Sequence, residues 1–145
     1  MDPQYSDAFL AKVNAAAAKR ASDPQTILHD VYAAIVQGNF DAAGEGMTED
    51  VELNICGFAP MNGTWSGRAA VIDATRNNFA LLAGQQPEID GMISQGESVA
   101  VLLRESGVLK SNGQAYNIRG VQWFTFAGGK IKRIDEIVAS VEEIK

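Results

Sequence analysis

In the first half of the chain, apolar residues recur at intervals of three and four, which is the spacing of one face of an α-helix. The pattern predicts four helical segments, over residues 6–21, 24–37, 41–47 and 68–82. The second segment has the clearest start, because Asp23 can cap the helix and Pro24 suits its first position. The apolar face of this helix consists of Leu28, Val31, Tyr32 and Ile35.

Apolar and polar residues alternate over 51–55 and again from residue 88 onward, which is typical of strands. Turn signals at 95–96, 112–113 and 128–129 divide the second half into a meander. The expected strands span residues 88–94, 98–110, 115–126 and 130–140, and residues 57–67 are expected to form a loop. Since the two middle strands are too long to stay straight in a small domain, we expect them to bend at Gly107 and Gly120.

A two-residue turn at 112–113 would pair Leu103 with Gln122 and would determine which side chains share a face of the sheet. One face is then apolar except for Glu105 and Gln122, and we expect the helices to cover it. A carboxylate on such a face must be paired, protonated or open to a water-filled cavity. Two interpretations of Glu105 remain open: it faces a cavity, or it lies at a frayed rim where a bulge turns it to the other face.

The opposite face of the sheet is mixed in polarity. It carries an apolar cluster of Leu102, Val121 and Trp123, which is too large to leave in water without purpose. A partner subunit or another segment should therefore cover this face, and we expect a homodimer formed through it.

The composition excludes several classes of protein. The chain has 145 residues, which suits one domain, and its formal net charge of −6 argues against nucleic acid as a partner. The single Cys56 and the single His29 cannot supply a structural zinc site; we expect Cys56 to be a small buried residue and His29 to point outward. No apolar run is long enough for a membrane span and no basic leader begins the chain, so we expect a cytoplasmic protein without membrane contact.

Four short motifs resemble those of SnoaL-like and ketosteroid isomerase-like members of the nuclear transport factor 2-like superfamily. They are YAAIVQGNFDAA at 32–43, MTEDV at 47–51, GTWSGRAAV at 63–71 and GKIKRI at 129–134. The resemblance covers about residues 25–140. It implies an α+β fold, a cone-shaped α+β barrel in which helices pack on a strongly bent antiparallel sheet. The domain then spans 24–145, and residues 1–23 form an extra N-terminal helical extension.

At the positions that correspond to the catalytic residues of ketosteroid isomerases, this chain has other residues. In ketosteroid isomerases the general base is an Asp at the end of the first strand, where this chain has Ile55. The acid that faces the substrate oxygen corresponds to Gln122, which can donate a hydrogen bond but is not an acid. The oxygen-binding Tyr falls at Val31, one residue before Tyr32, so Tyr32 is a possible substitute.

The epoxide hydrolase branch of the superfamily resembles the chain differently. Its Arg-x-Asp element corresponds to Arg104-Glu105-Ser106, where Ser106 replaces the Asp, and its second acid corresponds to Glu136. Simple pairing across the last turn would instead bring Asp135 onto the inner face. The spacing of apolar residues in the last strand suggests a bulge, which favours Glu136. Both acids remain candidates.

These considerations predict a pocket with few polar groups. A carboxylate of Glu105, Asp135 or Glu136 would act as base, and Tyr32 or Gln122 would donate a hydrogen bond. Apolar ligand-binding contacts are expected from Val31, Ile55, Phe58, Trp65, Phe79, Leu103 and Phe124. Phe58, Met61 and Trp65 precede the third helix and would serve either as a lid or as a plug at the open end of the cone.

The expected function is proton-transfer chemistry, such as isomerisation, cyclisation or hydration, on a small, mostly apolar, oxygenated ligand. This chemistry would use no metal and no cofactor. The alternative is a non-catalytic ligand-binding or dimerisation module of the same fold, which the absence of an acid at Ile55 favours.

Overall fold

The computed structural model describes residues 6–8 and 23–140. The helix predicted over 6–21 lies outside the described residues except for its first three positions, so the proposed boundary between residues 23 and 24 stays a prediction. The continuous described range begins with the cap of α2 (Pro24–Val36): the side chain of Asp23 accepts a hydrogen bond from the Gln25 N–H.

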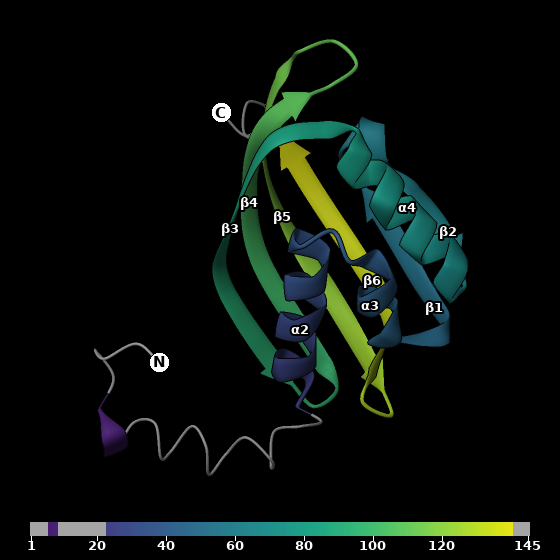
Figure 1. Cartoon of the computed structure of the whole chain (residues 1–145), viewed down its shortest axis with the longest axis vertical. Helices are drawn as coiled ribbons and strands as arrows, with labels where there is room; N and C mark the ends of the chain where they lie inside the picture. Colours follow the sequence, from purple (N-terminus) through teal and green to yellow (C-terminus); the bar gives the residue numbers. More distant parts are fainter. Residues whose placement is uncertain (1–5, 9–22, 141–145) are drawn as a thin grey trace.

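Three helices lie on one face of a six-stranded sheet (Figure 1). The other helices are α3 (Phe40–Glu45), α4 (Arg68–Ala80) and a 3-10 turn, η1 (Ala59–Met61). The strands are β1 (Met47–Cys56), β2 (Gly63–Ser66), β3 (Leu82–Gln95), β4 (Ser98–Leu109), β5 (Ala115–Ala127) and β6 (Lys130–Ser140). The predicted α+β fold class is confirmed.

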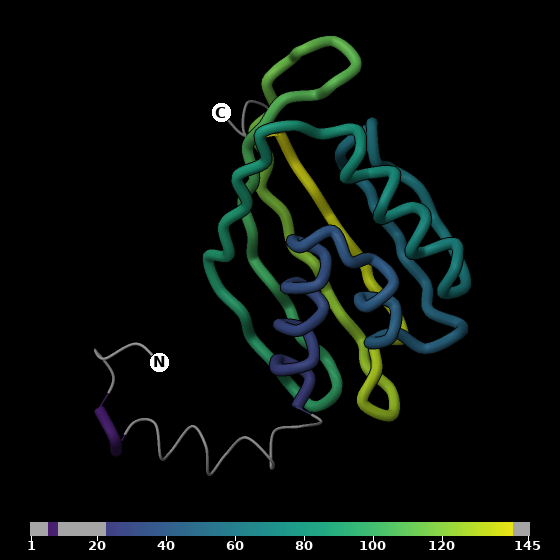
Figure 2. Tube along the Cα trace, viewed as in Figure 1, coloured from purple at the N-terminus to yellow at the C-terminus, as the bar shows by residue number. Residues whose placement is uncertain are grey.

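The strand order is β2-β1-β6-β5-β4-β3. The predicted meander of four strands, β3 to β6, is present, and its long members curve around the helices (Figure 2). All neighbours in the sheet are antiparallel except β1 and β6, which run parallel. The sheet is therefore mixed rather than wholly antiparallel as expected, because β1 pairs not only with β2 but also, in parallel, with the last strand of the meander.

Strand β1 begins at Met47, four residues before the predicted start, and two further segments differ from the sequence prediction. Residues 63–66, predicted as part of a loop, form β2 and pair with β1, with Trp65 opposite Leu53. Helix α4 ends earlier than predicted, and β3 begins at Leu82 rather than near residue 88. Residues 82–87 can belong to a strand because β3 lies at the edge of the sheet. An edge strand tolerates Gly84 with positive φ and Pro87, whereas a central strand would not.

The hairpin between β4 and β5 has a longer turn than expected. The N–H of Leu109 donates to the carbonyl of Gln114, and residues 110–113 make the turn. Leu103 therefore faces Gly120, and the predicted pairing of Leu103 with Gln122 is wrong by two positions. A shift of two residues leaves every side chain on its predicted face, since side chains alternate with a period of two.

The pairing of β4 with β5 is continuous through Gly107 and Gly120. A bulge at either glycine, which would have turned Glu105 to the outer face, is absent from this ladder. The lack of a side chain at Gly107 has another consequence: a Cβ there would lie 2.6 Å from the Tyr116 hydroxyl oxygen. Gly107 therefore makes room for the ring of Tyr116 on the inner face.

The pairing of β5 with β6 contains the predicted bulge. Phe126 faces Ile131 whereas Thr125 faces Arg133, so Lys132 is the extra residue. Beyond the bulge, Glu136 faces Gln122 and Asp135 faces Trp123. This single extra residue decides which of the two acidic side chains points to the inner face.

The core lies between the helices and the inner face of the sheet. Its completely buried members include Leu28, Val51, Val71, Val99, Val101 and Ile131. A second, smaller cluster contains Leu82, Tyr116, Ile118 and Val138. In β1 the buried positions alternate through Val51, Leu53 and Ile55, so Cys56 is exposed and its predicted burial is wrong. His29 is exposed on α2, as predicted.

Candidate functional site

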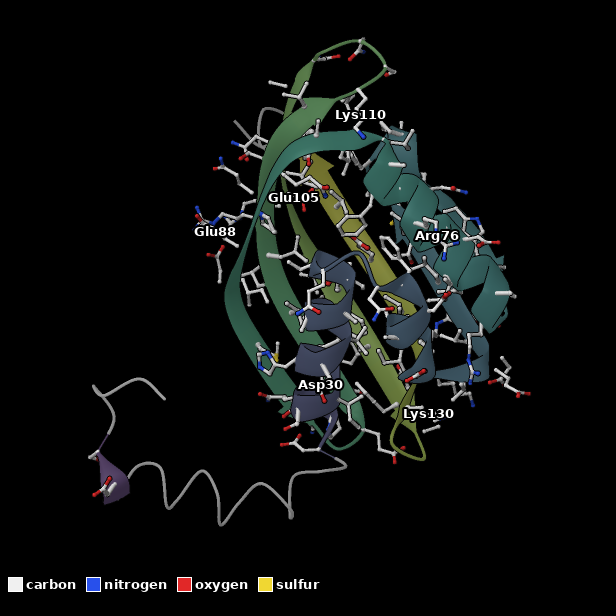
Figure 3. All side chains as sticks on the ribbon, in the orientation of Figure 1. Asp30, Arg76, Glu88, Glu105, Lys110 and Lys130 are labelled. Carbon is white, nitrogen blue, oxygen red and sulfur yellow. The ribbon has the colours of Figure 1, made fainter. Side chains whose placement is uncertain are left out.

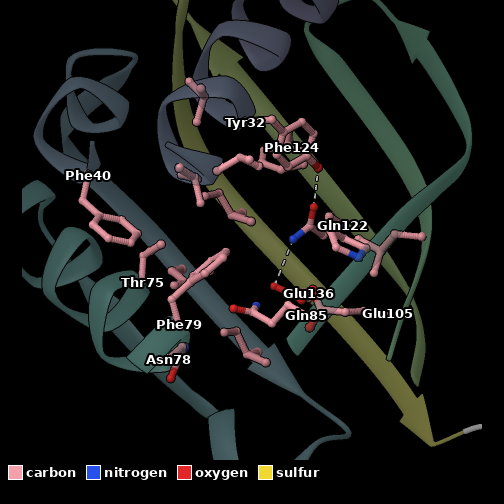
Figure 4. A pocket seen from close by; sticks show the side chains of 18 of the residues that line it. Tyr32, Phe40, Thr75, Asn78, Phe79, Gln85, Glu105, Gln122, Phe124 and Glu136 are labelled. Atoms are coloured by element: carbon pink, nitrogen blue, oxygen red, sulfur yellow. Dashed lines mark hydrogen bonds between the residues drawn. The ribbon is translucent and has the colours of Figure 1, made fainter. Parts of the chain in front are cut away.

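A cavity of about 790 Å³ lies between α2, α4 and the inner face of the sheet (Figure 4). This volume is within the range of small-molecule sites, which is roughly 300–1,000 Å³. Its wall is mostly apolar, as expected for such sites. Five of the seven predicted apolar contacts line it, namely Val31, Ile55, Phe79, Leu103 and Phe124.

A chain of hydrogen bonds joins three elements on the wall of this cavity (Figure 4). The hydroxyl of Tyr32, on α2, donates to Oε1 of Gln122, on β5. Nε2 of Gln122 donates to Oε2 of Glu136, on β6, at 3.3 Å. Gln122 and Glu136 are direct neighbours across the two strands, and the ring of Tyr32 packs edge-on against Phe124 with centroids 6.0 Å apart.

Glu105 also faces the cavity. It lies over the inner face of the sheet, whereas Glu88 lies at the edge of the molecule (Figure 3). The hydroxyl of Tyr116 donates to Oε2 of Glu105 at 2.7 Å. Of the two interpretations left open by the sequence, the structure therefore supports the cavity.

The electrostatics of the site follow from burial and from the proximity of two carboxylates. Burial raises the pKa of Glu136, the Gln122 N–H partly opposes this, and the charge of Glu105 raises the pKa further. Burial also raises the pKa of Tyr32, and the charge of Glu136 adds to it. The pKa of Tyr116 is raised by burial, by its hydrogen bond to Glu105 and by the charge of that group. Both hydroxyls therefore keep their protons at neutral pH.

The described residues that line the cavity include three acids, Glu88, Glu105 and Glu136, but no Lys, Arg or His. The acid at the edge, Glu88, is paired with Arg104 at 2.5 Å. The two inner acids have only neutral hydrogen-bond partners. An anionic ligand would therefore meet repulsion without any compensating positive side chain.

One side of the cavity carries three polar residues that were not predicted as site residues, namely Thr75, Asn78 and Gln85. The hydroxyl of Thr75 donates to the carbonyl of Val71 within its own helix. Within the described ranges, no hydrogen bond involves the side-chain amide of Asn78 or Gln85. The spacing of Thr75 and Asn78 from Phe79 on α4 could have indicated the first two, but Gln85 lay in a segment not predicted as a strand.

Three predicted site residues lie elsewhere. Asp135 is on the outer side of β6, where it bonds to Arg133 at 2.9 Å and to Asn54 at 3.1 Å. The bulge in β6 turns it away from the cavity. Phe58 packs on Tyr116 with ring centroids 5.7 Å apart, and Trp65 packs against the main core. Neither aromatic residue lines the cavity, because both are held by the strands and turns beside β1.

In residues 6–8 and 23–140, no group of three or more His, Cys, Asp or Glu side chains could hold a metal ion. No helix in the described part of the chain is both long and apolar enough to cross a membrane.

A family model for the SnoaL-like domain matches residues 28–134. The chain belongs to the SnoaL-like domain family. The SnoaL-like match contains Tyr32, Glu105 and Gln122 and ends two residues before Glu136. No curated protein matches this SnoaL-like chain.

Solved structures share the fold at low sequence identity. An NTF2-like protein from Burkholderia xenovorans LB400 is 24% identical, with a TM-score of 0.70 over 79% of this chain and 88% of that one. An NTF2-like protein of unknown function from Burkholderia pseudomallei K96243 is 21% identical, with a TM-score of 0.72 over 83% and 94%. A protein with a ketosteroid isomerase-like fold from Catenulispora acidiphila DSM 44928, in complex with trimethylamine, is 16% identical, with a TM-score of 0.64 over 76% and 82%. The SnoaL-like chain therefore has the NTF2-like cone.

Proposed function

We propose that this protein catalyses proton transfer on a small, mostly apolar, oxygenated ligand, with Glu136 as the acid-base group. The observation that carries the proposal is the Tyr32–Gln122–Glu136 chain of hydrogen bonds on the wall of an otherwise apolar cavity. Isomerisation and cyclisation of a carbonyl compound begin with removal of a proton from carbon, and hydration uses the same kind of group to take a proton from water. The SnoaL-like family includes polyketide cyclases and isomerases, which agrees with this class of chemistry.

The position of Glu136 supports its role. Ile55 occupies the place where ketosteroid isomerases have their base, and Glu136 is the neighbour of Ile55 across the parallel strands β1 and β6. A carboxyl group is thus present beside the missing base, on the adjacent strand. Its raised pKa suits a general base, because a carboxylate that binds a proton more strongly takes one more readily from carbon.

The ligand that best fits this cavity is uncharged. Its apolar body would contact side chains such as Phe79, Leu103 and Phe124. A carbonyl oxygen would lie near Tyr32, with the carbon that loses the proton near Glu136. In the reaction, the C–H bond breaks, the proton forms an O–H bond on Glu136, and the electron pair moves to the carbonyl oxygen. Return of the proton to another atom of the ligand completes the transfer.

The proposal is tested by solvent exchange. The protein is incubated in D₂O with a panel of neutral cyclic ketones and enones, and deuterium incorporation next to the carbonyl is followed by NMR. We expect faster incorporation than in buffer for ketones that fit the cavity and no acceleration for carboxylate analogues of the same size.

A second candidate function is favoured by Ile55, which removes the usual base from the cavity wall. In that case the protein binds ketones without moving a proton. Saturable binding of the ketones, seen as perturbed protein resonances, with deuterium incorporation equal to the buffer rate would establish the binding module and overturn the catalytic proposal.

We also propose that the outer face of the sheet forms a homodimer. Leu102, Val121 and Ile137 lie in one row across β4, β5 and β6, and Trp123 lies beside them. All four are exposed, Trp123 by 46% and Ile137 by 63%. One apolar patch can pair with its own copy across a two-fold axis.

Sedimentation equilibrium tests this interface. The wild-type protein is expected to sediment as a dimer and the Trp123→Glu variant as a monomer, because two buried carboxylates would face each other across the axis. Leu81→Glu is the matched control, since Leu81 follows α4 and is exposed to a similar degree. A monomeric wild type, or equal weakening by both variants, would contradict the dimer.

A further inference from the structure

Gln122 forms hydrogen bonds to a hydroxyl and to a carboxyl group, which differ in whether they donate or accept. An amide has an oxygen that only accepts and a nitrogen that only donates, whereas a hydroxyl does both. With Tyr32 donating to Oε1 and Nε2 donating to Glu136, the bonds run from Tyr32 through Gln122 to a carboxyl oxygen that accepts. This direction suits a carboxylate, which is acceptor-only.

Protonation of Glu136 changes this direction. Within the described ranges, Gln122 is the only hydrogen-bond partner of the Glu136 side chain. Once Glu136 is protonated, its O–H keeps a hydrogen-bond partner in the protein only if it points to Gln122. The O–H then needs an acceptor at the place that the Nε2 donor of Gln122 now occupies. A half-turn of the amide about its last bond supplies Oε1 there and brings Nε2 to the oxygen of Tyr32.

After this half-turn, Tyr32 accepts from Gln122 and can no longer donate to it. In the described part of the chain, the Tyr32 hydroxyl forms no hydrogen bond other than the one to Gln122. Tyr32 lines the cavity, so its hydrogen becomes available to a ligand oxygen there. The hydroxyl itself stays protonated throughout.

We propose that Gln122 is a switch that couples Glu136 to Tyr32: when Glu136 takes a proton from the ligand, the amide turns over and Tyr32 donates its hydrogen to the ligand oxygen. The inference rests on the proposed function and adds a positioning residue to it. The proton moves from a ligand carbon to Glu136, the electron pair moves to the ligand oxygen, and the amide rotation itself transfers no proton. The reverse rotation accompanies return of the proton to the ligand.

The switch has a catalytic consequence. Tyr32 is engaged with Gln122 while the ligand oxygen is neutral, and it becomes a free donor as that oxygen gains negative charge. Because the rotation follows protonation of Glu136, the new hydrogen bond stabilises the charged intermediate more than the bound ligand. Such a bond lowers the free energy of the intermediate without tightening ground-state binding.

The groups that surround Glu136 bear on its titration. Glu105 on β4 and Glu88 on β3 line the same cavity, Tyr32 faces it from α2, and Tyr116 on β5 holds Glu105. Helix α4 contributes only the neutral Thr75, Asn78 and Phe79 to the wall, and β1 contributes only apolar residues. The charge that acts on Glu136 is therefore that of Glu105, which raises the pKa of Glu136 and does not bond to Tyr32.

The switch is tested without any substrate, by NMR titration of protein labelled at Tyr Cζ and Glu Cδ with ¹³C. The chain has three tyrosines, so Tyr32→Phe and Tyr116→Phe assign the resonances. In the wild type we expect the Tyr32 Cζ resonance to shift with the same midpoint pH as the Glu136 carboxyl. In Glu136→Gln this shift is expected to disappear. A Tyr32 resonance that stays constant while Glu136 titrates would overturn the switch.

Gln122→Met separates the switch from a through-space effect of the Glu136 charge. Met has a similar length but cannot bond to both groups. We expect Glu136 to titrate at a higher pH in this variant, because it loses the Gln122 N–H, while the Tyr32 resonance no longer follows it. If Tyr32 still follows Glu136, the coupling acts through space and the switch is wrong.

The NMR titration tests the switch, and the deuterium-exchange assay tests the proposed catalysis, so either result can be negative without the other. Coupled titration without exchange would retain the switch and overturn the proposed catalysis. Exchange without coupled titration would retain the catalysis and overturn the switch.

Discussion

Replacement of Glu136 by Gln is expected to lower the rate of deuterium exchange into a ketone by about 10²- to 10⁴-fold, the usual contribution of a general acid-base group. The substitution keeps the shape of the side chain but removes its ability to take a proton. Asp135→Asn is the matched control, because Asp135 is the preceding residue yet lies on the outer face, bonded to Arg133. Equal losses in both variants would show that the effect is not that of a cavity base.

The same Glu136→Gln substitution is expected to stabilise the fold at neutral pH. Folding raises the pKa of this carboxyl above its ordinary value of 4.5, so the folded state holds the proton at a pH where the unfolded chain has released it. The free energy of unfolding of the wild type should therefore fall as the pH rises from about 4.5 through the raised pKa. Each pKa unit of this difference corresponds to about 1.4 kcal/mol.

Urea denaturation of wild type and Glu136→Gln at a series of pH values measures this effect. The difference in unfolding free energy between the two proteins should grow in favour of the variant as the pH rises through that window. A difference that does not depend on pH would contradict a carboxyl whose folded pKa is raised.

Replacement of Gly57 by Ala is expected to be the most destabilising single change outside the cavity. Gly57 follows β1 with a φ of +90°, and a Cβ there would lie 1.7 Å from the backbone oxygen of Val138. Because that oxygen belongs to β6 and cannot rotate away, the two chain segments would have to separate. We expect a loss of about 4 kcal/mol or more in the free energy of unfolding.

Gly67→Ala is the control for backbone strain. Gly67 has a φ of +94°, but no atom lies within 4 Å of the position of its Cβ. This variant should lose only the cost of the conformation, roughly 1–3 kcal/mol. Urea denaturation compares the two variants, and equal losses would show that the approach of β6 to Gly57 adds nothing.

The position of Glu136 shows which part of the candidate site could be predicted from the sequence. Apolar residues at 131, 134 and 138 cannot share one face of a regular strand, so the spacing itself predicted a bulge. The structure confirms that bulge and places Glu136 opposite Gln122. A local pattern was sufficient here because the alternation of side chains is a property of the strand alone.

The corrected details depend on contacts with distant segments. Trp65 lies in a strand only because β1 offers it an edge to pair with, and nothing within residues 63–66 shows this. The turn of the β4–β5 hairpin is longer than its Asn-Gly signal suggests, since the loop ends where the Leu109 N–H meets Gln114. In both cases the hydrogen bonds of the assembled sheet outweigh the local preference.

The sequence by itself determined the helices, most of the strands and the inner face on which Glu105 and Gln122 lie, because these follow from the period of apolar residues along one segment. Only the tertiary structure decided which polar groups meet. Tyr32 and Gln122 are 90 positions apart, and their bond exists because α2 packs on the inner face of the sheet, where Gln122 and Glu136 are neighbours (Figure 4). Periodicity specifies the face on which a side chain lies, whereas the packing of helix on sheet specifies its neighbour across the cavity.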